Sequence, residues 1–182
     1  SITRLVTFLK QKKLRFYPVM IYLVTKALHL QTLFRLGMDQ EGNVGYWDSI
    51  DPSYTIFHKE TETFSCLWSS WNLDFHSFYP QICSDMESHQ NFFHFSMPDI
   101  PPNHFDISCL PWLSYDSFHI NVNPGTYLAP IITWGKYLEK EGEIQLPLSF
   151  QIHHSAADGF HVSQFYQDLD RLIAAFIEEY PL

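Results

Sequence analysis

The sequence is poor in cysteine, and the few cysteines lack the spacing of a structural site. Cys66, Cys83 and Cys109 are odd in number and include no CxxC pair, the usual signature of zinc and redox centres. Disulfides persist mainly in oxidising compartments. We therefore expect three reduced thiols in a cytoplasmic protein that holds no metal.

Long apolar runs and an excess of positive charge are also lacking. The most apolar early stretch, residues 17–30, is interrupted by Lys26 and is too short to cross a bilayer; no signal peptide is visible. The formal net charge of −9 disfavours nucleic acid and anionic membranes as partners. An anionic cofactor would therefore need a local cluster of cationic side chains.

The chain does have enough apolar residues for a sizeable core. Of its 182 residues, 46% are hydrophobic, and no internal repeat, low-complexity tract or domain boundary divides them. We expect one domain over residues 1–182. Because Ser1 leads directly into a helical pattern, we expect the sequence to lack the N-terminal segment of a longer protein.

The spacing of apolar residues predicts an α/β fold, a two-layer sandwich with helices on one face of a mixed sheet. Helical periodicity occurs at residues 2–12, 16–30, 73–90 and 159–179. Runs rich in β-branched and aromatic residues predict strands within 34–71 and at 106–111, 118–122, 129–138 and 143–154. Turn residues occur at 40–43 and 51–53.

The most informative motif is His-His-Ser-Ala-Ala-Asp-Gly, residues 153–159, between a predicted strand and a predicted helix. Side chains alternate along a strand, so His153 and His154 should point to opposite faces, which argues against one metal ion held by both. His154 shares the parity of the apolar positions. Burial on that less hydrated face would keep its imidazole neutral and able to accept a proton.

This pattern favours group transfer by general-base catalysis. A single histidine at a strand end is more often structural, but the neighbouring Asp158 and Gly159 at a strand-to-helix junction favour a functional interpretation. Asp158 could take part in the site or fix the backbone of the loop.

The motif matches the HHxxxDG signature of chloramphenicol acetyltransferases, which also occurs in 2-oxo acid dehydrogenase cores and peptide-synthetase condensation domains. Other segments resemble the first family specifically: residues 16–23, 60–65, 107–112 and 129–133. The resemblance extends over essentially the whole chain. It implies an enzyme that uses acetyl-CoA to O-acetylate chloramphenicol, confers resistance, and acts as a homotrimer with active sites at subunit boundaries.

The resemblance implies catalytic roles for four residues. His154 matches the base that deprotonates the chloramphenicol hydroxyl, and Ser108 matches the serine that stabilises the oxyanion. Thr133 matches a threonine that holds a water against the intermediate. Asp158 matches a structural aspartate that pairs with an N-terminal arginine. Taken alone, Ser108 and Thr133 would be read as ordinary strand hydroxyls.

Two binding surfaces are implied in the same way. The positions that match the CoA channel are Arg15, Tyr17, Trp112, Lys136 and Tyr137. The cations among them would supply the patch that the acidic composition requires. The positions that match the apolar chloramphenicol pocket are Phe64, Phe95, Phe118, Ile120 and Val122. Core packing would explain the apolar residues equally well.

The family's N-terminal segment, which carries the arginine partner of Asp158, has no match in this sequence. We therefore expect Asp158 to be a poorly compensated charge if it is buried, and the 182-residue chain to be unstable and inactive alone. Two other functions remain open. One is the acyltransferase core of a 2-oxo acid dehydrogenase complex, and the other is a trimeric protein that binds the drug without catalysis.

Overall fold

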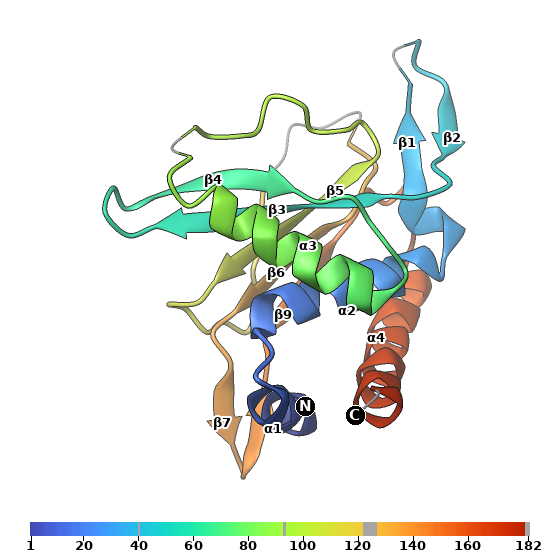
Figure 1. Ribbon diagram of the computed structural model, residues 1–182. Helices are drawn as coiled ribbons and strands as arrows, with labels where there is room; N and C mark the ends of the chain where they lie inside the picture. The colour runs from blue at the N-terminus through green and yellow to red at the C-terminus, as the bar shows by residue number, and fades with distance from the viewer. Residues whose placement is uncertain (40, 93, 122–126, 181–182) are drawn as a thin grey trace.

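The computed structural model describes residues 1–39, 41–92, 94–121 and 127–180. Its centre is a five-stranded mixed sheet with the order β4-β3-β5-β6-β9 (Figure 1). The strands are β3 (Asp51–His58), β4 (Thr63–Trp68), β5 (His104–Leu110), β6 (Ile131–Gly135) and β9 (Leu148–Gln151). β3 and β5 run parallel, as do β5 and β6, whereas both edge strands are antiparallel to their neighbours.

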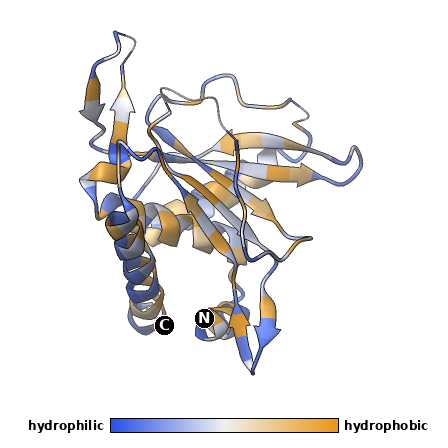
Figure 2. Cartoon of the chain, turned by 180° about the vertical axis from the view of Figure 1, so that it is seen from behind, coloured by the Kyte–Doolittle hydropathy of each residue, from blue (hydrophilic) through white to orange (hydrophobic). Residues whose placement is uncertain are grey.

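Helices form the second layer. They are α1 (Thr3–Lys12), α2 (Phe16–His29), α3 (Phe75–Ser88) and α4 (Gly159–Glu179), with a 3-10 turn at Thr32–Arg35. α2 is the most deeply buried and packs against α3, α4 and β3. Pro18 is tolerated because the first turn of a helix has no internal partner for its N–H groups. Seen from the opposite side, no helix formed by the described residues lies across the sheet (Figure 2).

The strand register divides the sheet into two chemically different faces, because side chains of paired residues project to the same side. On the helix-covered face, Tyr54 is aligned with Leu67 and Ile107, and Ile132 with Phe150. The first four of these side chains belong to the buried core, and the partly buried Phe150 packs against it. The opposite face, called here the open face, carries Ser53, Thr55, Asp106, Ser108, Thr133, Ser149 and Gln151.

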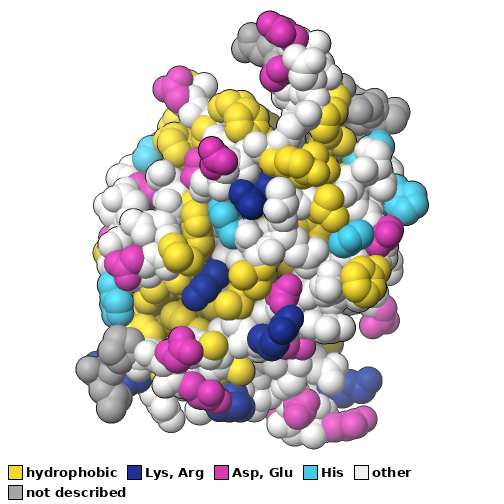
Figure 3. Space-filling model, turned by 90° about the vertical axis from the view of Figure 1, so that its right-hand side faces the viewer, with side chains coloured by type: hydrophobic (Ala, Val, Ile, Leu, Met, Phe, Trp, Pro, Cys, Tyr) yellow, Lys and Arg dark blue, Asp and Glu magenta, His cyan; other side chains and the backbone are white. Residues whose placement is uncertain are grey.

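Two small hairpins extend from this framework. β1 (Leu36–Met38) pairs with β2 (Val44–Tyr46), and β7 (Leu138–Lys140) pairs with β8 (Glu143–Gln145). The first projects away from the sheet at the upper right of Figure 1. On the side of the molecule formed by this hairpin and α4, acidic and basic side chains are interspersed (Figure 3).

The predicted fold class and the four predicted helices are confirmed. Asp74 and Asp158 cap α3 and α4 through backbone N–H groups of the first turn, which fixes where these helices begin. Phe160 differs from its expected place in the apolar stripe of α4, because it is 65% exposed.

The strand predictions need three corrections. Residues 51–53, expected as a turn, open β3, where Pro52 occupies the second position of the strand. Residues 118–121 lie outside any strand, and Val122 lies outside the described residues. The two long strands expected at 129–138 and 143–154 are divided into β6, β7, β8 and β9. Pro147 precedes β9 and has no N–H for a ladder bond.

Three expectations about the described residues have separate outcomes. The cysteines are all free. The described helices include none that is long and apolar enough to cross a membrane. β9 ends at Gln151, so strand parity does not reach the histidines, and both His153 and His154 are exposed. The expectation that His154 lies on a buried face is therefore wrong for the single chain.

Candidate active site

Ser108 and Thr133 occupy one row of the open face. Ser108 of β5 is aligned with Thr133 of β6, which is aligned in turn with Ser149 of β9. Thr133 is 2% exposed, and its carbonyl accepts a hydrogen bond of 2.8 Å from the Tyr115 hydroxyl. Ser108 is half-buried. The sheet therefore places these two hydroxyl-bearing residues side by side on adjacent strands.

A cavity of about 990 Å³ opens beside Ser108. β3 and β5 are paired only as far as Tyr54 and Ile107, so the following residues of these parallel strands can diverge. The cavity walls include residues 55–60 from β3 and its turn, and residues 108–112 from β5 and beyond. Ser108 is thus the point where the open face meets the cavity.

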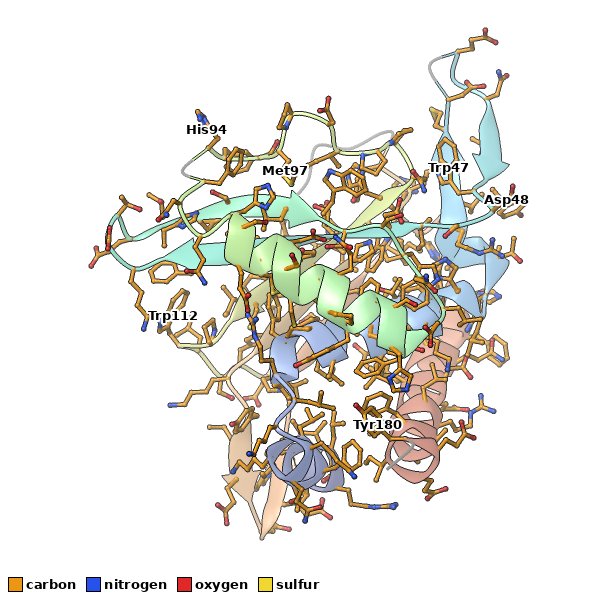
Figure 4. All side chains as sticks on the ribbon, viewed as in Figure 1. Trp47, Asp48, His94, Met97, Trp112 and Tyr180 are labelled. Atoms are coloured by element: carbon orange, nitrogen blue, oxygen red, sulfur yellow. The ribbon has the colours of Figure 1, made fainter. Side chains whose placement is uncertain are left out.

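Three of the residues predicted to bind the cofactor line this cavity: Arg15, Tyr17 and Trp112. The Arg15 guanidinium is 3.0 Å from Glu87, so a bound anion would compete with that carboxylate. The Tyr17 hydroxyl donates to the Thr55 carbonyl at 2.9 Å. Burial raises the pKa of Tyr17 well above its ordinary value, so the ring is a neutral donor. Trp112 is 59% exposed at the end of the sheet (Figure 4).

Lys136 and Tyr137 are exposed and are absent from the described cavity wall. Tyr137 contacts Phe16 edge to face at 5.9 Å between ring centroids, and the Lys136 N–H donates to the Leu113 carbonyl at 2.6 Å. Tyr137 thus lies beside the residue that follows Arg15, although neither Lys136 nor Tyr137 is among the described residues of the cavity wall. Their role in cofactor binding stays a prediction.

The residues predicted to bind the acceptor fall into two groups. Phe64 lines the cavity and contacts Phe95 edge to face at 5.6 Å; Phe95 is 72% exposed. Phe118 and Ile120 lie at the other side of the open face, against Tyr115 and Gln151 respectively. The fifth residue, Val122, lies outside the described part of the chain.

The two motif histidines differ in the state of their ring nitrogens. The Ser155 N–H donates to His153 Nδ1 at 3.2 Å, so that nitrogen is an acceptor and the neutral ring carries its proton on Nε2. His154 Nδ1 lies 3.4 Å from the Ala157 carbonyl, which can only accept. The proton of neutral His154 is therefore on Nδ1, and its Nε2 lone pair is left for a reactant.

Asp158 is an exposed capping residue. Its carboxylate accepts hydrogen bonds from Phe160 N at 3.0 Å and His161 N at 3.4 Å, and lies 2.9 Å from His161 Nδ1. Slight desolvation pushes the pKa of Asp158 up, but the bonds and charge of His161 outweigh it and lower the pKa. The condition under which Asp158 would be a poorly compensated charge is therefore not met in the single chain: Asp158 is exposed, and His161 completes a capping box with it.

Comparison with known proteins identifies the family. The chloramphenicol acetyltransferase family model matches residues 1–170. A chloramphenicol acetyltransferase of Clostridium butyricum is 42% identical over 180 residues, which is 98% of this chain and 82% of that protein. The chain belongs to the chloramphenicol acetyltransferase family. It is therefore an enzyme of the acyltransferase class.

Solved structures share the fold with this acetyltransferase family member. A chloramphenicol acetyltransferase superposes with a TM-score of 0.76 at 24% identity, covering 91% of this chain and 80% of that one. The catalytic core of a Thermoplasma acidophilum 2-oxoacid dehydrogenase complex gives a TM-score of 0.73 at 14% identity, with coverage of 95% and 82%. At these identities, the likenesses establish the architecture alone.

Within a single chain, His154 and Ser108 lie in separate parts of the structure. In the sheet order, β9 is two strands from β5, which amounts to about 10 Å at ordinary strand spacing. His154 lies beyond the end of β9 and is not among the described residues of the cavity wall. The chain thus carries two half-sites: a hydroxyl beside a cavity at the open face, and an exposed imidazole beyond the end of β9.

Sequence reasoning missed several residues of the first half-site. Cys109 lines the cavity next to Ser108, and burial raises the pKa of its thiol to about 11, which keeps it protonated and poorly nucleophilic. His58 also lines the cavity and contacts Ser65 at 2.8 Å. The β-forming residues at 55–57 lie within the region predicted to form strands, but that signal does not distinguish a cavity wall from core.

Proposed function

We propose that this chain transfers the acetyl group of acetyl-CoA to a hydroxyl of chloramphenicol and thereby confers resistance, with His154 as general base. Family membership over nearly the whole chain supports the substrates. The observation that carries the catalytic assignment is the exposed His154 ring, whose Nδ1 faces a carbonyl and whose Nε2 is left as the acceptor. Its neighbour His153 has the opposite arrangement.

The reaction needs a proton acceptor on the alcohol. His154 Nε2 removes the hydroxyl proton as the alcohol oxygen attacks the thioester carbonyl carbon, which forms a C–O bond and a tetrahedral oxyanion. The Ala157 carbonyl orients the ring and favours the imidazolium that results. When the C–S bond breaks, this imidazolium returns the proton to the departing sulfur. Atoms and charge balance without an acyl-enzyme.

In this proposal, the Ser108 hydroxyl donates a hydrogen bond to the oxyanion. A preorganised donor of this kind acts strongly because it favours charge that exists only in the transition state. Thr133, aligned with Ser108 on the adjacent strand, would hold a water against the same intermediate. Cys109 takes no part as a nucleophile, because its thiol is protonated at neutral pH.

The cavity between β3 and β5 suits the extended arm of acetyl-CoA. Its lining includes aromatic side chains from Tyr17, Phe57 and Trp112, cations at Arg15 and Lys59, and Ser108. An acyl group delivered along it would reach Ser108. Glu60 and Glu62 also line it, so the phosphates are best placed on the side of Arg15.

A complete site requires the two half-sites from different copies of the chain. The spatial separation of His154 from Ser108 within one chain supports a homotrimer in which the imidazole of one subunit reaches the cavity of the next. Nothing in the described residues groups His, Cys, Asp or Glu as metal ligands, and the proposed chemistry uses none. The acidic charge, the free thiols and the intracellular cofactor favour a cytoplasmic location.

The test compares His154→Ala with His153→Ala in a thiol-release assay with chloramphenicol and acetyl-CoA. Loss of the base should reduce the transfer rate by about 10³-fold or more, while chloramphenicol still binds in equilibrium dialysis. The His153 variant should stay within about tenfold of wild type, because its lone pair is already engaged. If His154→Ala protects cells unchanged, the protein sequesters the drug and the proposal is wrong.

A further inference from the structure

A segment of the chain crosses the open face and is tied down from the sheet beneath it. This strap, residues 113–121, begins where the Leu113 carbonyl accepts from Lys136 N at 2.6 Å. Its Tyr115 hydroxyl donates to the Thr133 carbonyl at 2.8 Å. Near its end, the Ile120 backbone is bound by the side chain of Gln151. The strap thus lies over β6 and β9, the strands that carry Thr133 and lead to His154.

The contact between Gln151 and Ile120 uses both halves of an amide. Gln151 Nε2 donates to the Ile120 carbonyl at 2.8 Å, and Gln151 Oε1 accepts from Ile120 N at 3.1 Å. The side chain therefore pairs with Ile120 as a neighbouring strand would. Only a primary amide of this length offers one donor and one acceptor in that geometry, since a carboxylate cannot donate and a thioether can do neither strongly.

Pinning the backbone at one residue determines which side chains face the sheet. Phe118 and Ile120 are half-buried, whereas Ser117, His119 and Asn121 are exposed, the alternation of an extended segment. Phe118 also packs against Tyr115, with 5.2 Å between ring centroids. A rotation of the strap about its axis would exchange these sets, and the two bonds from Gln151 oppose that rotation.

The position of Gln151 connects this strap to the proposed base. Gln151 is the last residue of β9, and His154 follows three residues later. We propose that Gln151 is a positioning residue: its amide clamps Ile120 so that Phe118 and Ile120 form a fixed apolar wall for the acceptor alcohol beside His154. This inference deepens the proposed function and rests on it. It predicts that Gln151 acts on the acceptor and not on acetyl-CoA.

The experiment uses the full chain and three variants. Gln151→Met keeps the length of the side chain but removes both bonds, and Gln151→Glu keeps an acceptor but sets a carboxylate against the Ile120 carbonyl. Gln145→Met makes the same substitution at an exposed position of β8 and serves as the matched control. The readouts are the two KM values, kcat, and the hydrogen-exchange rate of the Ile120 amide.

We expect Gln151→Met to raise the KM for chloramphenicol roughly tenfold, because it removes a pair of partly buried hydrogen bonds. The KM for acetyl-CoA should stay within about twofold. Ile120 N should exchange faster in both Gln151 variants, while the Gln145 control matches wild type. An unchanged Ile120 exchange rate, or an equal rise of both KM values, would overturn the inference. If wild type transfers no acetyl group, the proposed function fails separately, and the exchange rates still decide whether Gln151 clamps the strap.

Discussion

The two faces of the central sheet are built from the same strands but have opposite chemistry. On the helix-covered face, Ile107, Ile132 and Trp134 are at most 2% exposed and lie within one apolar core. On the open face, the next residues along, Ser108 and Thr133, present hydroxyl groups. Consecutive residues of β5 and β6 therefore contribute to different faces, because successive side chains of a strand point to opposite sides of the sheet.

This difference separates stability from catalysis within single strands. Apolar burial on the helix side supplies the main driving force for folding, whereas a row of hydroxyls contributes little unless each is paired. The open face carries its polar row under a strap instead of under helices. Substitutions on the two faces should therefore fail in different ways, one in unfolding and the other in acetyl transfer.

The largest expected effect is on the helix-covered face. Trp134 is 1% exposed, and its ring centroid lies 5.6 Å from that of Tyr17. Trp134→Ala should therefore lower the free energy of unfolding by about 3–5 kcal/mol, the cost of a large cavity in a packed core. Urea denaturation followed by circular dichroism measures this change. The control is Trp112→Ala, at a side chain that is 59% exposed, where less than about 1.5 kcal/mol should be lost. Equal losses at both sites would erase the distinction.

The next effect belongs to the open face and should spare stability. Ser108→Ala should reduce kcat by about 10²–10³-fold, as loss of an oxyanion donor does, with both KM values and the melting temperature nearly unchanged. Ser149→Ala is the matched control, because Ser149 occupies the same row two strands away and lies outside the described cavity wall. A comparable loss of kcat in both variants would mean that any hydroxyl of the aligned row affects catalysis, whether or not it borders the cavity.

Features that depend on residues close together in the sequence could be predicted, whereas features that depend on distant residues could not. Helical periodicity is a local signal, and it located α3 and α4 within two residues. The resemblance pointed to Ser108 and His154, but their separation depends on strand order, which no local pattern encodes. His154 was expected on a buried face because the strand was extended to it, whereas β9 stops at Gln151.

The cavity and the strap were also beyond sequence reasoning, for a physical reason. The cavity exists because β3 and β5 stop pairing after Tyr54 and Ile107, a relation between residues more than fifty positions apart in the chain. The strap is held by Gln151, whose amide finds Ile120 only after the chain has folded back. The sequence predicts a strand at residues 118–122, and the described residues 118–121 do alternate in burial. Ile120, however, pairs with the side chain of Gln151 and not with a strand.

A smaller effect would test how closely the strap lies on the open face. A Cβ added at Gly135 would lie 2.5 Å from the Leu113 carbonyl and 2.9 Å from the Tyr115 ring. Because the first of these atoms is backbone, Gly135→Ala should displace the strap and cost about 1–3 kcal/mol of stability. Gly45→Ala, in β2 with open space around it, should be neutral in the same thermal denaturation. No difference between them would mean that the strap moves freely.

The smallest effect concerns Asp158, at the point where the chain leaves the sheet and enters the helical layer. Its pKa is lowered in the folded protein, since the capping bonds and the charge of His161 outweigh slight desolvation. The charged form therefore contributes stability above the unfolded-state pKa of about 4, and this contribution is lost as the pH falls through the lower folded-state value. Asp158→Asn keeps a capping side chain but removes the charge, so it should melt slightly below wild type at pH 7 and match it near pH 3.

Asp170→Asn removes the same charge from an exposed position inside α4 and should show a smaller pH-dependent difference. If the difference in melting temperature between Asp158→Asn and wild type widened in acid, the capping role would be contradicted. The connection between the sheet and α4 would then depend on the loop alone.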